Sequence, residues 1–242
     1  MKTNRTVTSF FDKEYLEYAR YVVENRAIPS CIDGLKPTQR KVVYIANKIW
    51  KTGNEKPMKL FQLAGRVAAE AFYHHGNTSL ESSMVGMAQK FKNSLPLLQG
   101  VGQFGSLRSP AAGAPRYISA KLHPNFRLLY QDFDLLENKI EEGEKIEPAF
   151  FLPIVPTVIL NGTSGIAVGF ATNILNRNPK DVVDACISTL NDKKMKVLAP
   201  WIEEFKGTFT RDLENPKTWK IKGQHQIVNT TTVKISAIPP NY

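Results

Sequence analysis

The residue pair Arg116-Tyr117 is the part of this sequence best suited to chemistry. It lies in the segment of residues 100–122, which reads GVGQFGSLRSPAAGAPRYISAKL. The first part of this segment is rich in Gly, Ala and Pro and has no hydrophobic period, whereas residues 117–122 alternate as in a strand. A loop gives a nucleophile access and a strand fixes its direction, so a tyrosine at their junction suits nucleophilic attack. The alternative is an ordinary strand tyrosine beside a surface arginine.

A tyrosine nucleophile needs electrostatic help, because a phenol is mostly protonated at neutral pH. Arg116 is the nearest source of that help in the sequence. Its guanidinium can stabilise a phenolate and also the negative charge that builds up on a phosphate during transfer. The pair therefore points to attack on a phosphodiester.

The elements before this pair read as successive helices. Apolar residues at helical spacing predict a helix that ends near Asn25 and is capped by Thr8 or Ser9. Pro37 is placed to open a second helix that reaches about Trp50. Further helices are expected over residues 57–72, 79–91 with a capping box at 78–81, from 124 onward, and 179–191.

Two of these helices carry features that suit nucleic acid. Lys36, Arg40 and Lys41 gather at the start of the second helix, where backbone N–H groups and the helix dipole favour phosphate. The alternative is a solvated charged face. The helix of residues 79–91 has an outer face of small side chains, which lets its backbone come close to a partner such as a DNA groove or another helix. Its small residues are Ser79, Ser82, Ser83 and Gly86.

Short strands over residues 95–99 and 117–122 follow these helices, so the pattern is that of a winged helix. We expect the acidic stretch of residues 137–147 to be solvated, and the apolar run 152–160 to form an edge strand interrupted by prolines. Alternating stretches from residue 205 onward predict strands of a second unit. The expected fold class is α+β, with a first domain over residues 1–155 and a second over residues 156–242.

Four long motifs occur in one order and together resemble the breakage-reunion (gyrase A-like) subunit of type IIA DNA topoisomerases. They are GQFGS followed by RY, NRAIPSCIDGLKPTQRKV, FYHHGNTSL and LPIVPTVILNGTSGIAVGFATNI. The wording of the YHHG and DGLKPTQRK motifs is nearer to the eukaryotic and T-even phage branch than to bacterial gyrase. This resemblance implies that residues 156–242 begin the tower domain of the family. The sequence has no long coiled-coil segment, so we expect the exit gate of the family to be absent from this chain.

The resemblance implies roles for individual residues. Tyr117 would form a transient 5′-phosphotyrosyl link to DNA, with Arg116, Arg26 and His75 around the same phosphate. Ile166 matches an isoleucine that, in the family, is a wedge between base pairs, and a wedge of this kind kinks the duplex. The residues expected to contact DNA are Lys36, Arg40, Lys41, Asn77, Thr78, Ser82 and Ile166.

Composition agrees with a polyanionic partner, because the chain has a net charge of +10. Its two cysteines, Cys31 and Cys186, lack the spacing of a zinc site, and no apolar run is long enough for a membrane span, so we expect a cytoplasmic protein without a metal of its own.

The chain lacks the acidic magnesium cluster of the family and a GxxxxGK[ST] loop. Magnesium and ATP are therefore expected on a partner subunit with TOPRIM and ATPase domains, in an A2B2 assembly that contains a homodimer of this chain across the DNA gate.

Three other functions fit part of the pattern. A non-catalytic winged-helix DNA-binding module explains the charge and the helices but leaves the glycine-rich loop before Tyr117 unexplained. A tyrosine recombinase would share the nucleophile, but no His here has Arg three positions on. A catalytically inactive fragment of a topoisomerase is the third alternative.

Overall fold

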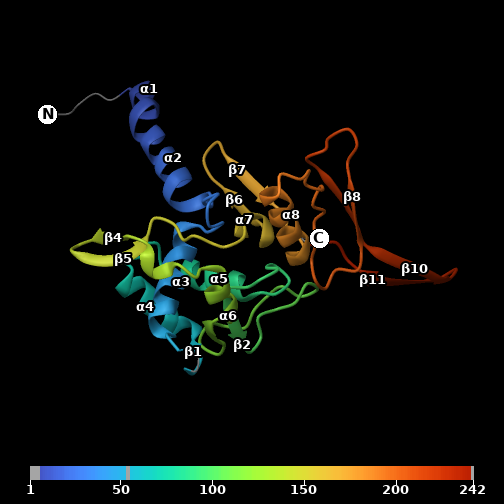
Figure 1. Ribbon diagram of the computed structural model, residues 1–242, viewed down its shortest axis with the longest axis horizontal. Coiled ribbons are helices and arrows are strands. Elements are labelled where there is room, and N and C mark those ends of the chain that lie inside the picture. The colour runs from blue at the N-terminus through green and yellow to red at the C-terminus, as the bar shows by residue number, and fades with distance from the viewer. Residues whose placement is uncertain (1–5, 53–54, 241–242) are drawn as a thin grey trace.

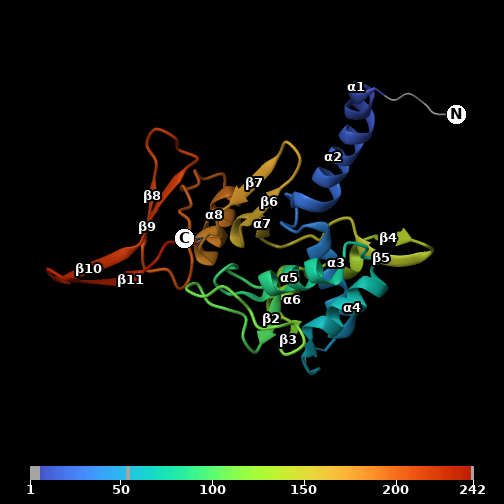
Figure 2. The same ribbon diagram turned by 180° about the vertical axis from the view of Figure 1, so that it is seen from behind.

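The computed structural model describes residues 6–52 and 55–240 of the chain. Figure 1 shows an N-terminal helical segment that projects from a central body, and a C-terminal part that ends in the hairpin of β10 (Gln224–Asn229) and β11 (Thr232–Ala237). In Figure 2 these two ends again point away from the body. Every strand pair between named strands of the described residues is antiparallel, and the helices are separate from the sheets, which confirms the α+β class.

The N-terminal segment is one helical rod in which α-helical and π-helical turns alternate. Its parts are α1 (Val7–Phe10), η1 (Phe11–Tyr15), α2 (Leu16–Val22) and η2 (Val23–Ala27). The predicted cap at Thr8 or Ser9 is wrong by two or three residues, because the N-cap is Thr6, whose side chain accepts the Ser9 N–H at 3.1 Å. A Thr hydroxyl satisfies a free N–H of the first turn equally well from this position.

The central body is a winged helix. Its helices are α3 (Pro37–Ile49), α4 (Leu60–Glu70) and α5 (Asn77–Ala88). Its sheet has the order β1-β3-β2, with β1 (Met58–Lys59), β2 (Leu98–Val101) and β3 (Ser119–Leu122). Pro37 opens α3 as predicted. The capping box predicted at residues 78–81 does not form, because α5 begins earlier, after Gly76, and has no side-chain cap.

The core lies between these helices and the small sheet. Fully buried side chains from each element meet there, among them Val42, Leu63, Leu80, Met84 and Leu98. Burying a side chain of this size contributes about 1.5–3 kcal/mol, so this contact fixes α5 and the sheet in one unit. The apolar residues of α5, among them Leu80 and Met84, therefore face the core.

An aromatic layer follows, beside α6 (Pro124–Leu129) and η3 (Phe133–Leu135), where Phe126, Phe133 and Phe151 pack against one another. The predicted acidic segment forms the hairpin of β4 (Asn138–Glu141) and β5 (Glu144–Pro148).

The expectation of a solvated segment is wrong for Glu147, which is 0% exposed. Its carboxylate pairs with Lys41 at 3.2 Å and with Lys139 at 2.8 Å. The two lysines compensate the charge that burial removes from water.

The predicted edge strand over residues 152–160 is also wrong. Its end is the short helix α7 (Thr157–Leu160), where the Thr157 hydroxyl donates to the Asp33 carbonyl at 2.7 Å. A long-range bond of this kind overrides the strand preference of the apolar residues.

The rest of the chain forms separate hairpins and one long helix. These elements are β6 (Thr163–Ile166), β7 (Ala171–Ile174), α8 (Pro179–Leu190), β8 (Thr208–Arg211) and β9 (Trp219–Lys222). The helix at residues 179–191 and the strands beyond 205 were predicted. The division at residues 155 and 156 stays a prediction, and the core extends across it, because Leu160 and Val182 belong to the same buried cluster as α3 to α5.

Candidate nucleic-acid interface and nucleophile

Tyr117 lies in a turn just before β3, and the residue is 73% exposed. The backbone around it is held: its N–H donates to the Ala114 carbonyl at 2.9 Å, and its own carbonyl accepts the Lys59 ammonium at 2.8 Å. Pairing of Lys59 in β1 with Ser119 in β3 fixes the base of this turn. The fixed backbone and free phenol are the arrangement that the sequence predicts for a nucleophile.

The Arg116 guanidinium lies 5.8 Å from the centre of the Tyr117 ring. This distance is within the range of about 6 Å over which a cation and an aromatic face attract each other. Arg116 is also exposed, so one phosphate could contact both side chains.

Arg26 and His75 form a second group, together with Tyr21, which the sequence did not single out. The Tyr21 hydroxyl and His75 Nε2 are 3.2 Å apart, and the imidazole packs edge-on against Tyr73 at 5.4 Å. Burial and the positive charge of Arg26 lower the pKa of His75, so the imidazole is neutral at pH 7. In the part of the chain that the structure describes, no hydrogen bond or ion pair joins this group to Tyr117.

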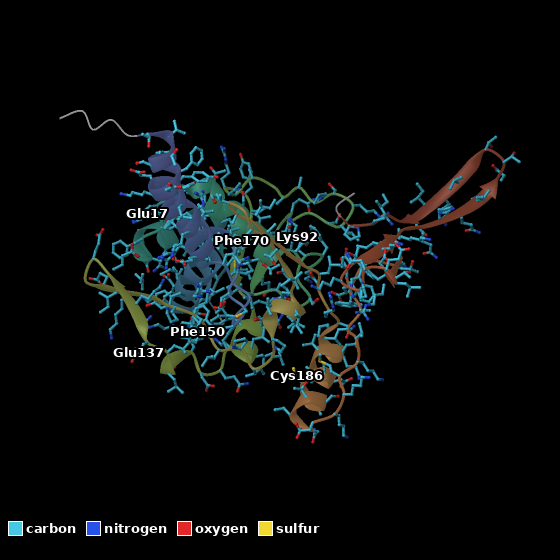
Figure 3. The ribbon with its side chains drawn as sticks, turned by 90° about the horizontal axis from the view of Figure 1, so that it is seen from above. Glu17, Lys92, Glu137, Phe150, Phe170 and Cys186 are labelled. Atoms are coloured by element: carbon cyan, nitrogen blue, oxygen red, sulfur yellow. The ribbon has the colours of Figure 1, made fainter. Side chains whose placement is uncertain are left out.

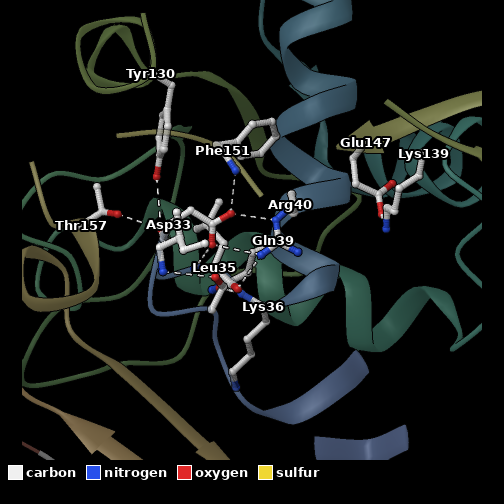
Figure 4. A network of polar contacts seen from close by, with 12 residues as sticks. Asp33, Leu35, Lys36, Gln39, Arg40, Tyr130, Lys139, Glu147, Phe151 and Thr157 are labelled. Carbon is white, nitrogen blue, oxygen red and sulfur yellow. Dashed lines mark hydrogen bonds and ion pairs between the residues drawn. The ribbon is translucent and has the colours of Figure 1, made fainter. Parts of the chain in front are cut away.

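Lys36 is the N-cap residue of α3, and its N–H donates to the Gln39 side chain at 2.9 Å. Figure 4 shows its aliphatic chain reaching away from the polar network around Asp33. Burial of this side chain lowers the pKa of Lys36. Its position at the helix N-terminus agrees with the predicted phosphate contact.

Arg40 and Lys41 do not share this position. Arg40 is 5% exposed and binds both carboxylate oxygens of Asp33, at 2.8 and 3.0 Å. The Lys41 ammonium lies against Glu147 and Glu141, at 3.2 and 3.6 Å, and its side chain is 13% exposed. Both cations are neutralised inside the protein, so we correct the prediction and leave them out of the DNA contacts proposed below.

The small face of α5 is open to solvent at Asn77, Thr78 and Ser82, while its opposite face enters the core. Ile166, at the end of β6, is 87% exposed. The hairpin of β6 and β7 is anchored at Gly165, where an added Cβ would meet the Ala27 carbonyl oxygen at 2.1 Å. The hairpin therefore presents Ile166 from a fixed base. Phe170, which is labelled in Figure 3 and precedes β7, is also exposed.

An open cavity of about 1120 Å³ connects these elements. Its walls include Arg26, Lys36, Ser82 and Ile166, and also two cations that the sequence analysis missed, Lys92 and Arg108. Among its described lining residues the one carboxylate is Asp33, which is buried and paired with Arg40. The cavity is therefore electropositive, although Tyr117 and Arg116 are not among its lining residues.

A magnesium site within this chain finds no support in the donor set. Across residues 6–52 and 55–240, no three His, Cys, Asp or Glu side chains come together. The sequence does contain one DxD spacing, Asp132-Phe133-Asp134, but Phe133 packs into the aromatic layer and no third ligand joins the two aspartates from the described part of the chain. No helix within the same residues has the length and apolar character of a membrane span.

Several known proteins are similar to this chain. The family model for the A subunit of DNA gyrase/topoisomerase IV matches residues 26–242. The DNA topoisomerase medium subunit of Enterobacteria phage T4 is 42% identical over 99% of this chain and 53% of its own length. DNA topoisomerase 2 of Arabidopsis thaliana is 40% identical over 97% of this chain and 16% of its own.

A solved structure, the topoisomerase II DNA-binding, cleavage and re-ligation domain of Plasmodium falciparum, superposes with a TM-score of 0.85 at 34% identity. The match covers 96% of this chain and 32% of that one. The chain thus spans about half of the phage relative and a smaller part of the others.

Proposed function

Because the chain belongs to the A-subunit family of DNA gyrase and topoisomerase IV, we propose that it is the DNA-cleaving part of an ATP-dependent type IIA topoisomerase. Tyr117 forms a transient 5′-phosphotyrosyl link to each strand of a duplex, so that a second duplex can pass. The observation that carries this proposal is the phenol of Tyr117, 73% exposed on a backbone held by Lys59 and beside the Arg116 guanidinium.

In the cleavage step, the Tyr117 oxygen attacks phosphorus and loses its proton. The bond from phosphorus to the 3′ oxygen breaks, and that oxygen takes up a proton and leaves as a 3′-hydroxyl. Arg116 lies beside the ring and stabilises the charge on phenolate and phosphate. One phosphodiester-like bond replaces another, so religation by the reverse step needs no energy input.

The electropositive cavity is the proposed path of the duplex. Lys36, Arg26, Lys92 and Arg108 line it and neutralise phosphates, while the small face of α5 lets its backbone approach a groove. Arg26 and His75 complete the cleavage centre, with His75 held by Tyr21. Since Arg26 and His75 form no bond to Tyr117 within the described chain, this part of the centre needs either bound DNA or a second copy of the chain.

Magnesium and ATP are proposed to belong to a partner subunit with TOPRIM and ATPase domains. When bound, magnesium supplies charge stabilisation at the scissile phosphate. Cleavage of both strands requires two copies of Tyr117, hence a homodimer within an A2B2 assembly. Similarity to a phage T4 protein suggests the cytoplasm of a bacterial host as the place of action.

The test is capture of the covalent intermediate. The chain would be mixed with its partner subunit, magnesium and duplex DNA labelled at the 3′ ends, because the fragment linked to Tyr117 carries the 3′ end of the strand, and the reaction would be stopped with denaturant. We expect label that migrates with this chain. DNA binding without any linked label would instead support the alternative, a non-catalytic winged-helix module.

Replacing Lys36 with glutamine should weaken DNA binding in a salt-dependent way. The slope of log affinity against log salt concentration is negative, and loss of one phosphate contact reduces its magnitude by about 0.9. Fluorescence anisotropy with a labelled duplex over a series of salt concentrations measures this slope. Lys48→Gln is the matched control, because Lys48 is exposed in the same helix but does not line the cavity. Equal slopes for Lys36→Gln and wild type would exclude the contact.

Replacing Ile166 with alanine should reduce the bend of bound DNA. A methyl group is too small to hold a base step open, so the kinked duplex loses its wedge. Energy transfer between dyes at the two ends of the duplex reports the bend, and we expect lower transfer than with wild type. Leu190→Ala, at an exposed leucine in α8 outside the cavity, should leave it unchanged. An unchanged bend in Ile166→Ala would remove the wedge from the proposal.

A further inference from the structure

The loop between β2 and β3 leads to Tyr117 and carries few bonds of its own. Within it, Ser106 and Ser109 exchange backbone hydrogen bonds at 2.8 and 3.2 Å, and the Gly113 N–H donates to the Gln103 carbonyl at 2.8 Å. The loop is mostly exposed, although Phe104 is buried. Its course must therefore be fixed from outside.

Gln89 provides that fixation from the end of α5. Its side chain is buried, with 2% of the residue exposed, and its amide nitrogen donates to two loop carbonyls, Phe104 at 2.8 Å and Pro110 at 3.0 Å. These two acceptors lie on opposite limbs of the loop. One amide group thus holds the limbs together, and both of its hydrogens are used.

The two limbs also approach each other closely at this point. Gly105 has φ +81°, and an added Cβ would meet the Pro110 carbonyl oxygen at 2.6 Å. Only glycine at position 105 allows the two limbs to come this close. The backbone itself therefore holds the Pro110 carbonyl within reach of the Gln89 amide.

The other end of the amide has no such partner. Gln89 Oε1 is buried and accepts no hydrogen bond from the residues that the structure describes. Rotating the amide would place this oxygen against the two carbonyl oxygens, so the observed orientation is the one in which Gln89 is a double donor. A methionine of similar length would fill the space without an unpaired oxygen, which argues that the donors are the reason for glutamine here.

We propose that Gln89 is a positioning residue for DNA cleavage, which ties the DNA-contacting helix α5 to the loop that carries Tyr117. This inference rests on the proposed function. Because α5 ends at Ala88 and Gln89 is its C-cap residue, the duplex and the nucleophile take their positions from the same helix.

The test is Gln89→Met in the full chain with its partner subunit, magnesium and labelled duplex. We expect the single-turnover rate of covalent adduct formation at saturating DNA to fall about 100-fold, the size of effect that a small misplacement of reacting groups produces. The dissociation constant for DNA should stay within about twofold: methionine keeps the backbone bond from the Lys92 N–H to the carbonyl of residue 89, and Arg108 is the one proposed DNA contact in the loop that the side chain holds. Gln99→Met, at an exposed glutamine in β2, is the matched control and should resemble wild type.

Limited proteolysis measures how well the loop is held, independently of catalysis. Trypsin should cut the free Gln89→Met chain at the exposed Arg108 or Arg116 faster than wild type, with no change at other sites.

Adduct formation at the wild-type rate in Gln89→Met would overturn the proposal. A variant in which the cleavage rate, the DNA affinity and the melting temperature all fall together would also overturn it, because such a result indicates a structural role alone. If Gln89→Met does not fold, Gln89→Glu takes its place, and failure of both to fold also rejects a positioning role. Absence of an adduct with wild type would instead count against the proposed function itself.

Discussion

Tyr117→Phe should form no covalent complex with DNA. The substitution removes the one oxygen that can attack phosphorus and keeps the ring beside Arg116. Loss of a nucleophile of this kind costs about 10⁴-fold or more in rate, which places the variant below detection in the adduct assay. Binding of duplex should be equal to that of wild type, because Tyr117 is exposed and its hydroxyl forms no hydrogen bond with any residue that the structure describes.

A second exposed tyrosine gives the matched control. Tyr15, in the N-terminal rod, is 41% exposed and lies outside the electropositive cavity. Tyr15→Phe should form the adduct at the wild-type rate. An adduct that persists in Tyr117→Phe would assign the nucleophile to another residue and reject the cleavage centre as proposed.

Elements marked by local residues could be predicted from the sequence. Pro37, Pro124 and Pro179 each stand at the first position of a helix, as expected, because proline needs no N–H partner there and already has helical φ. The strand material before and after the glycine-rich loop also pairs as a hairpin. In these cases the deciding interactions lie within one or two turns of the residue.

Features decided by distant partners could not be predicted. Lys41 looked like a phosphate contact, but its partner Glu147 is 106 residues away and comes from the hairpin that acidic composition marked as solvated. Residues 152–160 suggested a strand, but Thr157 bonds to Asp33, 124 residues away. No local pattern in a single sequence indicates which residues meet across such separations.

The Asp33 network is the most consequential of these distant contacts, and Asp33→Asn should destabilise the protein strongly. Asp33 is 0% exposed, and besides Arg40 its carboxylate accepts the N–H groups of Leu35 and Phe151, at 2.9 and 3.0 Å (Figure 4). Removing its charge leaves the buried guanidinium of Arg40 uncompensated. Breaking a buried ion pair in this way costs about 3–5 kcal/mol in the free energy of unfolding, which denaturation in urea measures.

The Asp33 backbone adds to this dependence, because its carbonyl accepts the hydroxyls of Thr157 and Tyr130, at 2.7 and 3.4 Å. Burial raises the pKa of Tyr130, so its phenol stays protonated and remains a donor. The network thus joins the turn before α3 to α7 and to the segment after α6. Lys36, the N-cap residue of α3, follows this turn, so Asp33→Asn should also weaken DNA binding in whatever fraction stays folded.

A double variant separates the loss of charge balance from the loss of packing. In Asp33→Asn with Arg40→Met, the unpaired cation is gone, so the free energy of unfolding should recover part of what Asp33→Asn alone loses. Asp184→Asn is the matched control: its pair with Lys180 lies on the exposed surface of α8, so its stability should stay close to wild type. If the double variant were less stable than Asp33→Asn alone, Arg40 would stabilise the fold through contacts other than the charge of Asp33, and the ion pair would not be what anchors the proposed DNA-binding end of α3.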